Sequence, residues 1–239
     1  MIPDRIRAVF FDAVGTVLHP EPGAPTVYAR EAERFGLAIA PDEILARFRA
    51  AYLLEETVDE LADWTTSEAR ERKRWQAIVS ATLPGAPSEC FDALFAHFAQ
   101  PQAWSAPPGI EAVLDRLAER GLRLGLASNY DSRLSFVLAG RPELQRLLGH
   151  VVISSHVGVR KPGRGFFQRV IEGAGCPPEQ IAFVGDDIDN DYRGAERAGM
   201  LALLLDPNER HPQIERRIRT LEELIGIQTT FAARSAITA

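Results

Sequence analysis

The segment Ala8-Val-Phe-Phe-Asp12-Ala-Val-Gly-Thr-Val-Leu18 places a carboxylate directly after a short apolar run. Such a run is typical of a strand buried in a parallel sheet. Ligands bind beyond the carboxyl ends of the strands in open α/β sheets, so Asp12 stands at a point where chemistry is expected. Its carboxylate can act as a nucleophile, and Gly15 lets the backbone turn away from the reacting group. An aspartate after a strand is more often a turn residue, so the rest of the chain must decide.

Further apolar runs predict that other strands join the same sheet. They are Leu122–Ala127, Val151–Ile153, Ile181–Val184 and Leu201–Leu205. Two amphipathic helical patterns, Ile110–Arg120 and Gly165–Gly173, lie between these runs. Strands that alternate with helices predict an α/β fold with a doubly wound parallel sheet.

Residues 20–103 have a different pattern, with no convincing strand. Four amphipathic segments in this part predict helices: Val27–Phe35, Pro41–Glu55, Ser67–Ala81 and Ser88–Phe98. Proline-rich connectors flank them, which predicts an inserted α-helical domain over 20–103 and a sheet domain built from 1–19 and 104–239. The insertion can be a cap hinged over an active site or a purely structural layer. The tail from residue 227 has weak periodicity and is expected to be frayed.

The composition makes a small-molecule substrate the default expectation. The chain has 239 residues, 46% of them apolar, and a formal net charge of −6, which argues against a general nucleic-acid binder. Its two cysteines, Cys90 and Cys176, have no metal-ligand spacing and predict reduced thiols. The first apolar run is broken by Asp12, so we expect neither a signal peptide nor a membrane span. A cytoplasmic monomer is the default expectation.

Two further polar clusters stand next to predicted elements, one after a strand and one before a helix. Ser128-Asn129 follows the second strand, and its hydroxyl, amide and backbone N–H groups can hold phosphoryl oxygens, although both residues are also common helix caps. Lys161 precedes the second helix and is one of two lysines among 27 basic residues. A flexible ammonium there can neutralise a carboxylate and a transferring group together, although most loop lysines are simply solvated.

The fourth cluster, Val184-Gly-Asp186-Asp187-Ile-Asp189-Asn190-Asp191, places four carboxylates within six residues after a predicted strand. Like charges at this density raise one another's pKa unless a cation holds them ionised. Oxygen ligands without histidine or cysteine favour a hard cation, and Mg²⁺ is preferred where carboxylates share it with a phosphate. A solvated acidic turn before a helix over Tyr192–Ala198 is the alternative.

Together these clusters resemble the four motifs of the haloacid dehalogenase-like hydrolase superfamily, in its helical-cap subgroup. The resemblance covers the sheet domain through Phe11–Leu18, Leu126–Asn129, Gly158–Pro162 and Val184–Gly199. It implies a Rossmann-like core under a mobile helical cap. It also implies that Asp12 is the nucleophile of an aspartyl-phosphate mechanism.

The same resemblance implies roles for the other motif residues. Ser128 and Asn129 would bind the phosphoryl oxygens of a small phosphorylated substrate. Lys161 would stabilise both the nucleophile and the charge of the substrate.

For the metal, the resemblance implies Mg²⁺ held by Asp12, Asp186 and the backbone carbonyl of Val14. Asp187 or Asp191 would support the ion through water. Neither a nucleic acid nor a membrane is an expected partner.

Val14 departs from the pattern of the family. Its phosphatases usually carry a second aspartate two residues after the nucleophile, which serves as general acid and base. A valine cannot transfer a proton, and such catalysis typically contributes about 10²–10⁴-fold. Dehalogenases of the superfamily also lack this aspartate, but they need no metal and lose the first acid of the fourth motif, whereas this chain keeps Asp186.

Three functions follow from these observations. The favoured one is a Mg²⁺-dependent phosphatase, slowed by the missing acid. The alternatives are a 2-haloacid dehalogenase that uses Asp12 without a metal, and an attenuated relative that binds a phosphorylated ligand or a partner. His19, Glu55 and Asp63 are candidates to replace the missing acid.

Overall fold

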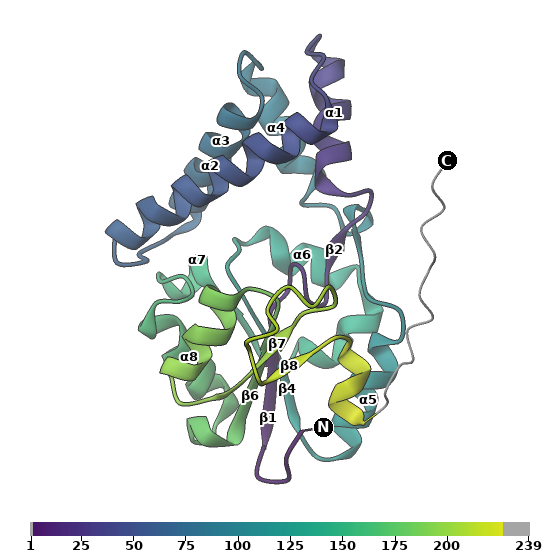
Figure 1. Cartoon of the computed structure of the whole chain (residues 1–239), viewed down its shortest axis with the longest axis vertical. Helices are drawn as coiled ribbons and strands as arrows, with labels where there is room; N and C mark the ends of the chain where they lie inside the picture. The colour runs from purple at the N-terminus through teal and green to yellow at the C-terminus, as the bar shows by residue number, and fades with distance from the viewer. Residues whose placement is uncertain (1, 227–239) are drawn as a thin grey trace.

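The computed structural model describes residues 2–226, so the expectation of a frayed tail lies outside the described residues. A six-stranded parallel sheet forms the centre of the molecule, with the strand order β5-β4-β1-β6-β7-β8 (Figure 1). The strands are β1 (Ala8–Phe11), β4 (Arg123–Ser128), β5 (Val151–Ile153), β6 (Ile181–Gly185), β7 (Leu201–Leu205) and β8 (Arg217–Ile218). The five predicted strands are confirmed, and the two-residue β8 was not predicted.

Strand β1 holds the central position because both of its faces are apolar. Val9 and Phe11 pack into one hydrophobic cluster, and Ala8 and Phe10 pack into a second cluster on the other face. Helices α5 (Ile110–Glu119) and α6 (Arg133–Ala139) cover the first face, whereas α8 (Arg164–Ala174) and α9 (Gly194–Arg197) cover the second. The doubly wound α/β fold is therefore confirmed.

The register of the sheet brings the predicted site together. Phe11 is paired with Leu126 of β4 on one side and with Val184 of β6 on the other. The carboxyl ends of these three strands therefore lie at one edge of the sheet, where the first, second and fourth polar clusters follow them.

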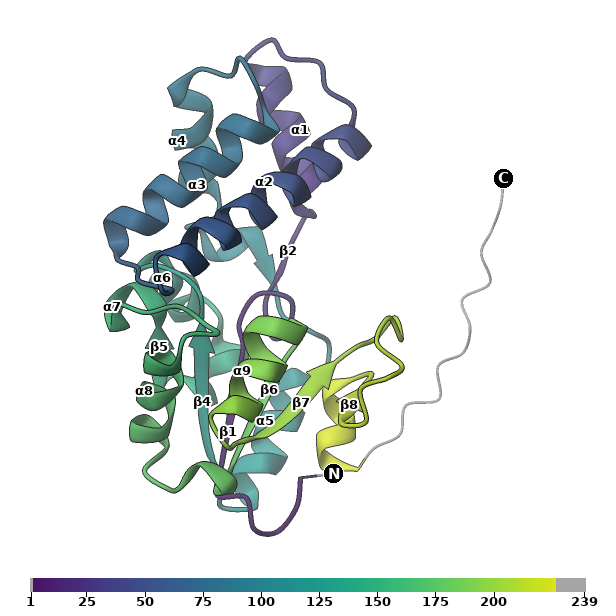
Figure 2. The same ribbon diagram turned by 60° about the vertical axis from the view of Figure 1, so that its left-hand side comes forward.

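Helices α1–α4, which we call the cap, lie together beyond this edge of the sheet, and we call the rest of the described chain the core (Figure 2). Their bounds are α1 (Ala24–Arg34), α2 (Pro41–Leu61), α3 (Glu68–Thr82) and α4 (Ser88–His97). The cap has a hydrophobic cluster of its own. An antiparallel pair of short strands, β2 (His19–Pro20) and β3 (Trp104–Ser105), holds the two connectors side by side.

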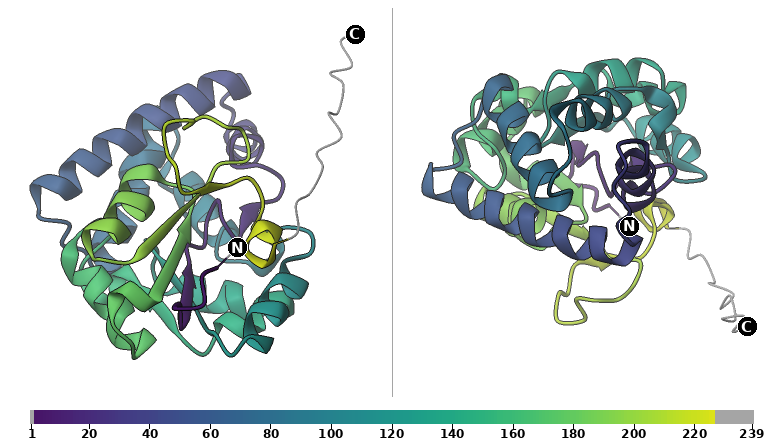
Figure 3. Two further views of the ribbon diagram at one scale, coloured as in Figure 1. Left: turned by 60° about the horizontal axis from the view of Figure 1, so that its bottom comes forward. Right: turned by 90° about the horizontal axis from the view of Figure 1, so that it is seen from above.

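All four cap helices are confirmed, but α2 is longer than predicted. It continues past Glu55 to Leu61, and because the apolar residues Val58 and Leu61 of this stretch are exposed, they do not continue the periodicity of a buried face. Viewed from above, the cap helices lie over the core (Figure 3). The division into residues 20–103 and the two flanking segments stays our proposal.

Short helices complete the fold: η1 (Pro101–Ala103), η2 (Pro142–Leu147), α7 (Ser154–Val157), η3 (Pro178–Gln180), η4 (Ile188–Arg193) and η5 (Leu221–Ile225). The helix predicted over Tyr192–Ala198 was wrong in its start. A π-helix, η4, precedes α9: the backbone N–H of Tyr192 donates to the carbonyl oxygen of Asp187, and the Asp187 side chain caps the first turn by accepting two backbone N–H bonds. In the described part of the chain, no helix is both long and apolar enough to cross a membrane.

Candidate active site

A cavity of about 420 Å³ lies between the cap and the carboxyl edge of the sheet. It is lined by every residue that we predicted for the site, namely Asp12, Val14, Ser128, Asn129, Lys161, Asp186, Asp187 and Asp191. The residues come from four separate stretches of the chain. The structure therefore brings the four predicted clusters into one place.

Lys161 is buried at the base of this cavity, with only 2% of its surface exposed. Its Nζ donates to Asp12 Oδ1 at 2.5 Å, to Asp191 Oδ1 at 2.6 Å and to the carbonyl oxygen of Ala127 at 3.2 Å. A solvated loop lysine is therefore ruled out for this residue. The ammonium holds the predicted nucleophile against one acid of the fourth cluster.

Asn129 lies where it was predicted, but the structure gives its amide a different use. The amide Nδ2 donates to the carbonyl oxygen of Lys161 at 3.0 Å, and the backbone N–H of Lys161 donates to Asn129 Oδ1 at 2.7 Å. Asn129 thus positions the loop that carries the lysine. Ser128 is 2% exposed and lines the cavity.

The acids of the fourth cluster divide into two roles. One carboxylate oxygen each from Asp12, Asp186 and Asp191 lie within 4.8 Å of one another. Asp187 instead caps the π-helix, where it accepts hydrogen bonds from two backbone N–H groups at 2.9 and 2.8 Å. Of the two residues considered for supporting a metal, Asp191 therefore has the closer position.

Two glycines allow these acids to approach the backbone. A Cβ at Gly15, whose φ is +95°, would lie 2.3 Å from Asp186 Oδ2. A Cβ at Gly185 would lie 2.3 Å from the Asp191 carboxyl group. Any side chain at either position would push a carboxylate out of the cluster.

The acids of this cluster outnumber the one ammonium that contacts them. Burial raises the pKa of Asp12, against the opposing effect of Lys161. Burial also raises the pKa of Asp186 to about 7, reinforced by Asp191, and raises the pKa of Asp191 to about 7. Burial alone would lower the pKa of Lys161, but the facing carboxylates raise it above its ordinary value. Three carboxylates share one ammonium, so a divalent cation fits their oxygen ligands and their charge.

The side chain of Val14 is 37% exposed and lines the cavity. The three candidates for a replacement acid, all within the described residues, lie outside that lining. Glu55 is paired with Arg70 at 2.7 Å, Asp63 lines a separate pocket, and His19 lies in the connector strand β2. The position expected for the general acid is therefore apolar, and none of the three candidate residues lines the cavity in its place.

The cap side of the cavity is aromatic, which the sequence analysis did not predict. Phe48 of α2 lies at the centre of this wall, with its ring centroid 5.6 Å from Tyr28, 6.2 Å from Tyr52 and 6.5 Å from Trp75. These residues were part of ordinary amphipathic patterns. Which of them face the cavity depends on how the cap is placed on the core.

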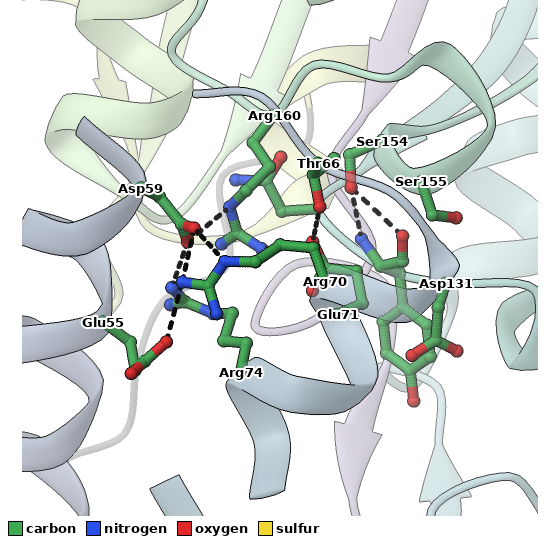
Figure 4. Close-up of polar contacts among 12 residues, drawn as sticks. Glu55, Asp59, Thr66, Arg70, Glu71, Arg74, Asp131, Ser154, Ser155 and Arg160 are labelled. Carbon is green, nitrogen blue, oxygen red and sulfur yellow. Dashed lines mark hydrogen bonds and ion pairs between the residues drawn. The ribbon is translucent and has the colours of Figure 1, made fainter. Parts of the chain in front are cut away.

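Arg160, which precedes Lys161 in the sequence, joins the core to the cap, and Figure 4 shows its side chain beside Asp59. Its Nη1 donates to Glu71 Oε1 at 2.6 Å and its Nη2 donates to Glu56 Oε1 at 3.1 Å, so a core guanidinium is buried among acids of α2 and α3. Its backbone N–H also donates to the carbonyl oxygen of Trp64 at 2.8 Å. The loop that carries the active-site lysine is therefore held by the cap.

We predict that Arg160→Met lowers the free energy of unfolding by about 3–5 kcal/mol, because it leaves the buried Glu71 without its cationic partner and with only the hydroxyl of Thr66 as a donor. Chemical denaturation measures the change. The matched control is Arg72→Met, which removes an ion pair to Asp92 whose side chains are 51% and 59% exposed. That change should cost less than about 1 kcal/mol. Equal decreases in the free energy of unfolding in the two variants would show that the buried ion pairs of Arg160 stabilise the protein no more than an exposed pair does.

Comparisons with known proteins agree with these motifs. Residues 6–199 match the haloacid dehalogenase-like hydrolase family. The chain is 31% identical over 210 residues to haloacid dehalogenase-like hydrolase domain-containing protein 3 of Xenopus laevis, covering 84% of this chain and 85% of that protein. It is 32% identical over 181 residues to a phosphoserine phosphatase of Thermus thermophilus, covering 70% of this chain and 68% of that protein.

Solved structures share the fold. A HAD phosphatase from Thermococcus onnurineus superposes with a TM-score of 0.65 at 24% identity, covering 92% of this chain and 96% of the other. The L-2-haloacid dehalogenase of Xanthobacter autotrophicus superposes with a TM-score of 0.67 at 21% identity, covering 86% and 80%. At these identities the likeness concerns the fold alone, and the family rests on the match over residues 6–199. The chain belongs to the haloacid dehalogenase-like hydrolase family.

Proposed function

We propose that this protein is a Mg²⁺-dependent phosphatase that transfers the phosphoryl group of a small phosphorylated substrate to Asp12. The observation that carries the proposal is the pairing of Asp12 with the buried Lys161, beside Asp186 and Asp191. A phosphatase among the sequence relatives supports it. We propose that it acts as a cytoplasmic monomer.

In the first step, the Asp12 carboxylate attacks phosphorus in line with the leaving oxygen. The Asp12 O–P bond forms, the ester P–O bond breaks, and the leaving oxygen keeps the electron pair. Lys161 stays protonated and neutralises charge on the nucleophile and on the phosphoryl oxygens. The Ser128 hydroxyl donates to a phosphoryl oxygen.

In the second step, water attacks the phosphorus of the aspartyl-phosphate and gives up a proton to solvent. The Asp12 O–P bond breaks, Asp12 keeps the electron pair as a carboxylate, and phosphate is released. Phosphatases of the family usually carry an acid and base two residues after the nucleophile, which serves both steps. Val14 can neither donate a proton to the leaving group nor take one from the water. Both steps therefore proceed here without a proton-transfer side chain at that position.

The metal would be held by Asp12, Asp186 and the backbone carbonyl of Val14, with Asp191 supporting it through water. A bound Mg²⁺ neutralises charge on the phosphoryl oxygens during transfer. The closeness of three carboxylate oxygens in a buried place supports the assignment, because a divalent cation offsets both their mutual repulsion and their desolvation.

We predict that a chelator abolishes phosphate release and that added Mg²⁺ restores it. Without substrate, Mg²⁺ should raise the melting temperature, because a ligand at 100 times its Kd stabilises the folded state by about 2.7 kcal/mol. Asp186→Asn should remove this shift. Asp189→Asn, which neutralises an acid that is 66% exposed and paired with Arg193, should keep it. Full activity in the presence of a chelator would contradict the metal assignment.

Carbon–halogen cleavage is the second candidate, because the apolar Val14 also suits a dehalogenase. Asp186 argues against it, because that acid is lost in the dehalogenases of the superfamily. Phosphate release from phosphate esters and halide release from 2-haloacids, each with and without Mg²⁺, separate the two. Halide release without phosphate release would replace our proposal, and binding of phosphate with Mg²⁺ but no turnover would favour the attenuated relative.

A further inference from the structure

We propose that the substrates of this protein are aryl phosphate esters, in which the leaving oxygen is attached to an aromatic ring. This inference rests on the proposed phosphatase function. Two separate observations carry it. One is the aromatic wall of the cavity, and the other is the apolar residue at the position of the general acid.

The cavity has one charged end and one aromatic end. Its core end holds Asp12 and Lys161, whereas its cap end is formed by Tyr28, Phe48 and Trp75 and by further aromatic residues of α4. A volume of about 420 Å³ lies within the range of about 300–1,000 Å³ that small-molecule sites have. Aromatic rings prefer edge-to-face or offset contacts, which the rings around Phe48 can offer to a flat ligand. A ligand with a phosphate at one end and a ring at the other matches this division.

Val14 restricts the leaving group by its chemistry. Without a proton donor, the leaving oxygen must depart as an anion. A phenol such as that of tyrosine has a pKa of about 10, whereas an aliphatic hydroxyl is a weak acid like water, whose pKa is about 15.7. A phenolate therefore leaves far more readily than an alkoxide. The exposed valine also extends the apolar surface to the place where the ring of an aryl ester would lie.

Other groups of the cavity do not replace the acid. Burial raises the pKa of Tyr52 to about 12 and raises the pKa values of Tyr28 and Tyr130 further, so none of the three phenols gives up its proton readily. Among the described residues, the cavity lining contains no histidine and no glutamate. The lining aspartates are those of the lysine and metal cluster and the helix-capping Asp187.

The test compares esters that share a ring but differ in the leaving oxygen. Phenyl phosphate releases a phenol, and benzyl phosphate releases an alcohol attached to the same ring. With Mg²⁺ present, we expect kcat/KM for phenyl phosphate to exceed that for benzyl phosphate by about 10²–10⁴-fold, the usual contribution of a general acid. Within ring-substituted phenyl phosphates, the logarithm of the rate should fall steadily as the pKa of the leaving phenol rises.

The aromatic wall is tested with Phe48→Ala. We expect a rise in KM for phenyl phosphate of about 3- to 10-fold, as one aromatic contact contributes. Inhibition by inorganic phosphate should stay unchanged, which also shows that the variant is folded. Phe136→Ala is the matched control, because this phenylalanine of α6 is 59% exposed and lies outside the cavity lining.

The outcomes separate the inference from the function on which it rests. Equal kcat/KM for phenyl and benzyl phosphates, or an unchanged KM for phenyl phosphate in Phe48→Ala, would overturn the aryl substrate class while the phosphatase stands. If no ester is turned over above the level of Asp12→Asn, the phosphatase itself is lost, and the inference falls with it.

Discussion

Replacement of Asp12 by asparagine is expected to reduce phosphate release by roughly 10⁴–10⁶-fold, as removal of other enzyme nucleophiles does. An amide does not attack phosphorus, so the covalent intermediate cannot form and its hydrolysis cannot follow. Phosphate release from phenyl phosphate, measured with Mg²⁺ present, gives the size of the effect.

The loss should not come from unfolding. Burial raises the pKa of Asp12, which means that the folded state disfavours its charge, so a neutral residue there should keep or increase stability at neutral pH. Lys161 would retain its bond to Asp191. Asp189→Asn is the control for the loss of one carboxylate from the region. Turnover in Asp12→Asn close to that of the unchanged protein would contradict the role of Asp12.

The second large effect is a gain. Val14→Asp is expected to raise kcat for benzyl phosphate by about 10²–10⁴-fold, because it supplies a proton to an alkoxide leaving group. The change is possible sterically, since the side chain of Val14 is 37% exposed and lines the cavity. Phenyl phosphate should gain less, because its leaving group needs the proton less.

Val14→Asn is the matched control for this gain. It has the shape and polarity of the aspartate but cannot transfer a proton, so it should leave the rate with benzyl phosphate near that of the unchanged protein. If Val14→Asp and Val14→Asn have the same rate, the proton is not the limiting defect. The claim that departure of an unprotonated alkoxide limits the rate with benzyl phosphate would then be wrong.

Much of the fold could be predicted because the strands are buried on both faces. An apolar run such as Ala8–Phe11 has few alternatives, and its bounds are those observed. The two-residue β8 is too short to leave a pattern. The π-helix before α9 is capped by the side chain of Asp187, and the acid-rich sequence does not distinguish such a cap from a solvated turn.

The site could be predicted where it depends on strand ends alone. Asp12 and Asp186 each follow a strand, and parallel neighbours bring such residues to one edge. The amide of Asn129 could not be assigned, because its use depends on the path of the Lys161 loop.

Most of the features that could not be predicted from the sequence depend on the position of the cap. Arg160 is buried against acids of α2 and α3, and Phe48 faces the cavity, only because of how the cap is placed on the core. Amphipathic periodicity shows that a helix has a buried face, but it does not say which partner covers that face.

The most direct test of the account is to trap the covalent intermediate. The protein is mixed with phenyl phosphate and Mg²⁺, quenched in acid during turnover, and analysed by mass spectrometry of its peptides. We predict one phosphoryl group on the peptide that contains Asp12, present in the unchanged protein and absent from Asp12→Asn. Because Val14 leaves the second step without a base, the intermediate should accumulate, and less of it should remain in Val14→Asp. Turnover of phenyl phosphate with no phosphoryl group on that peptide would contradict the central claim.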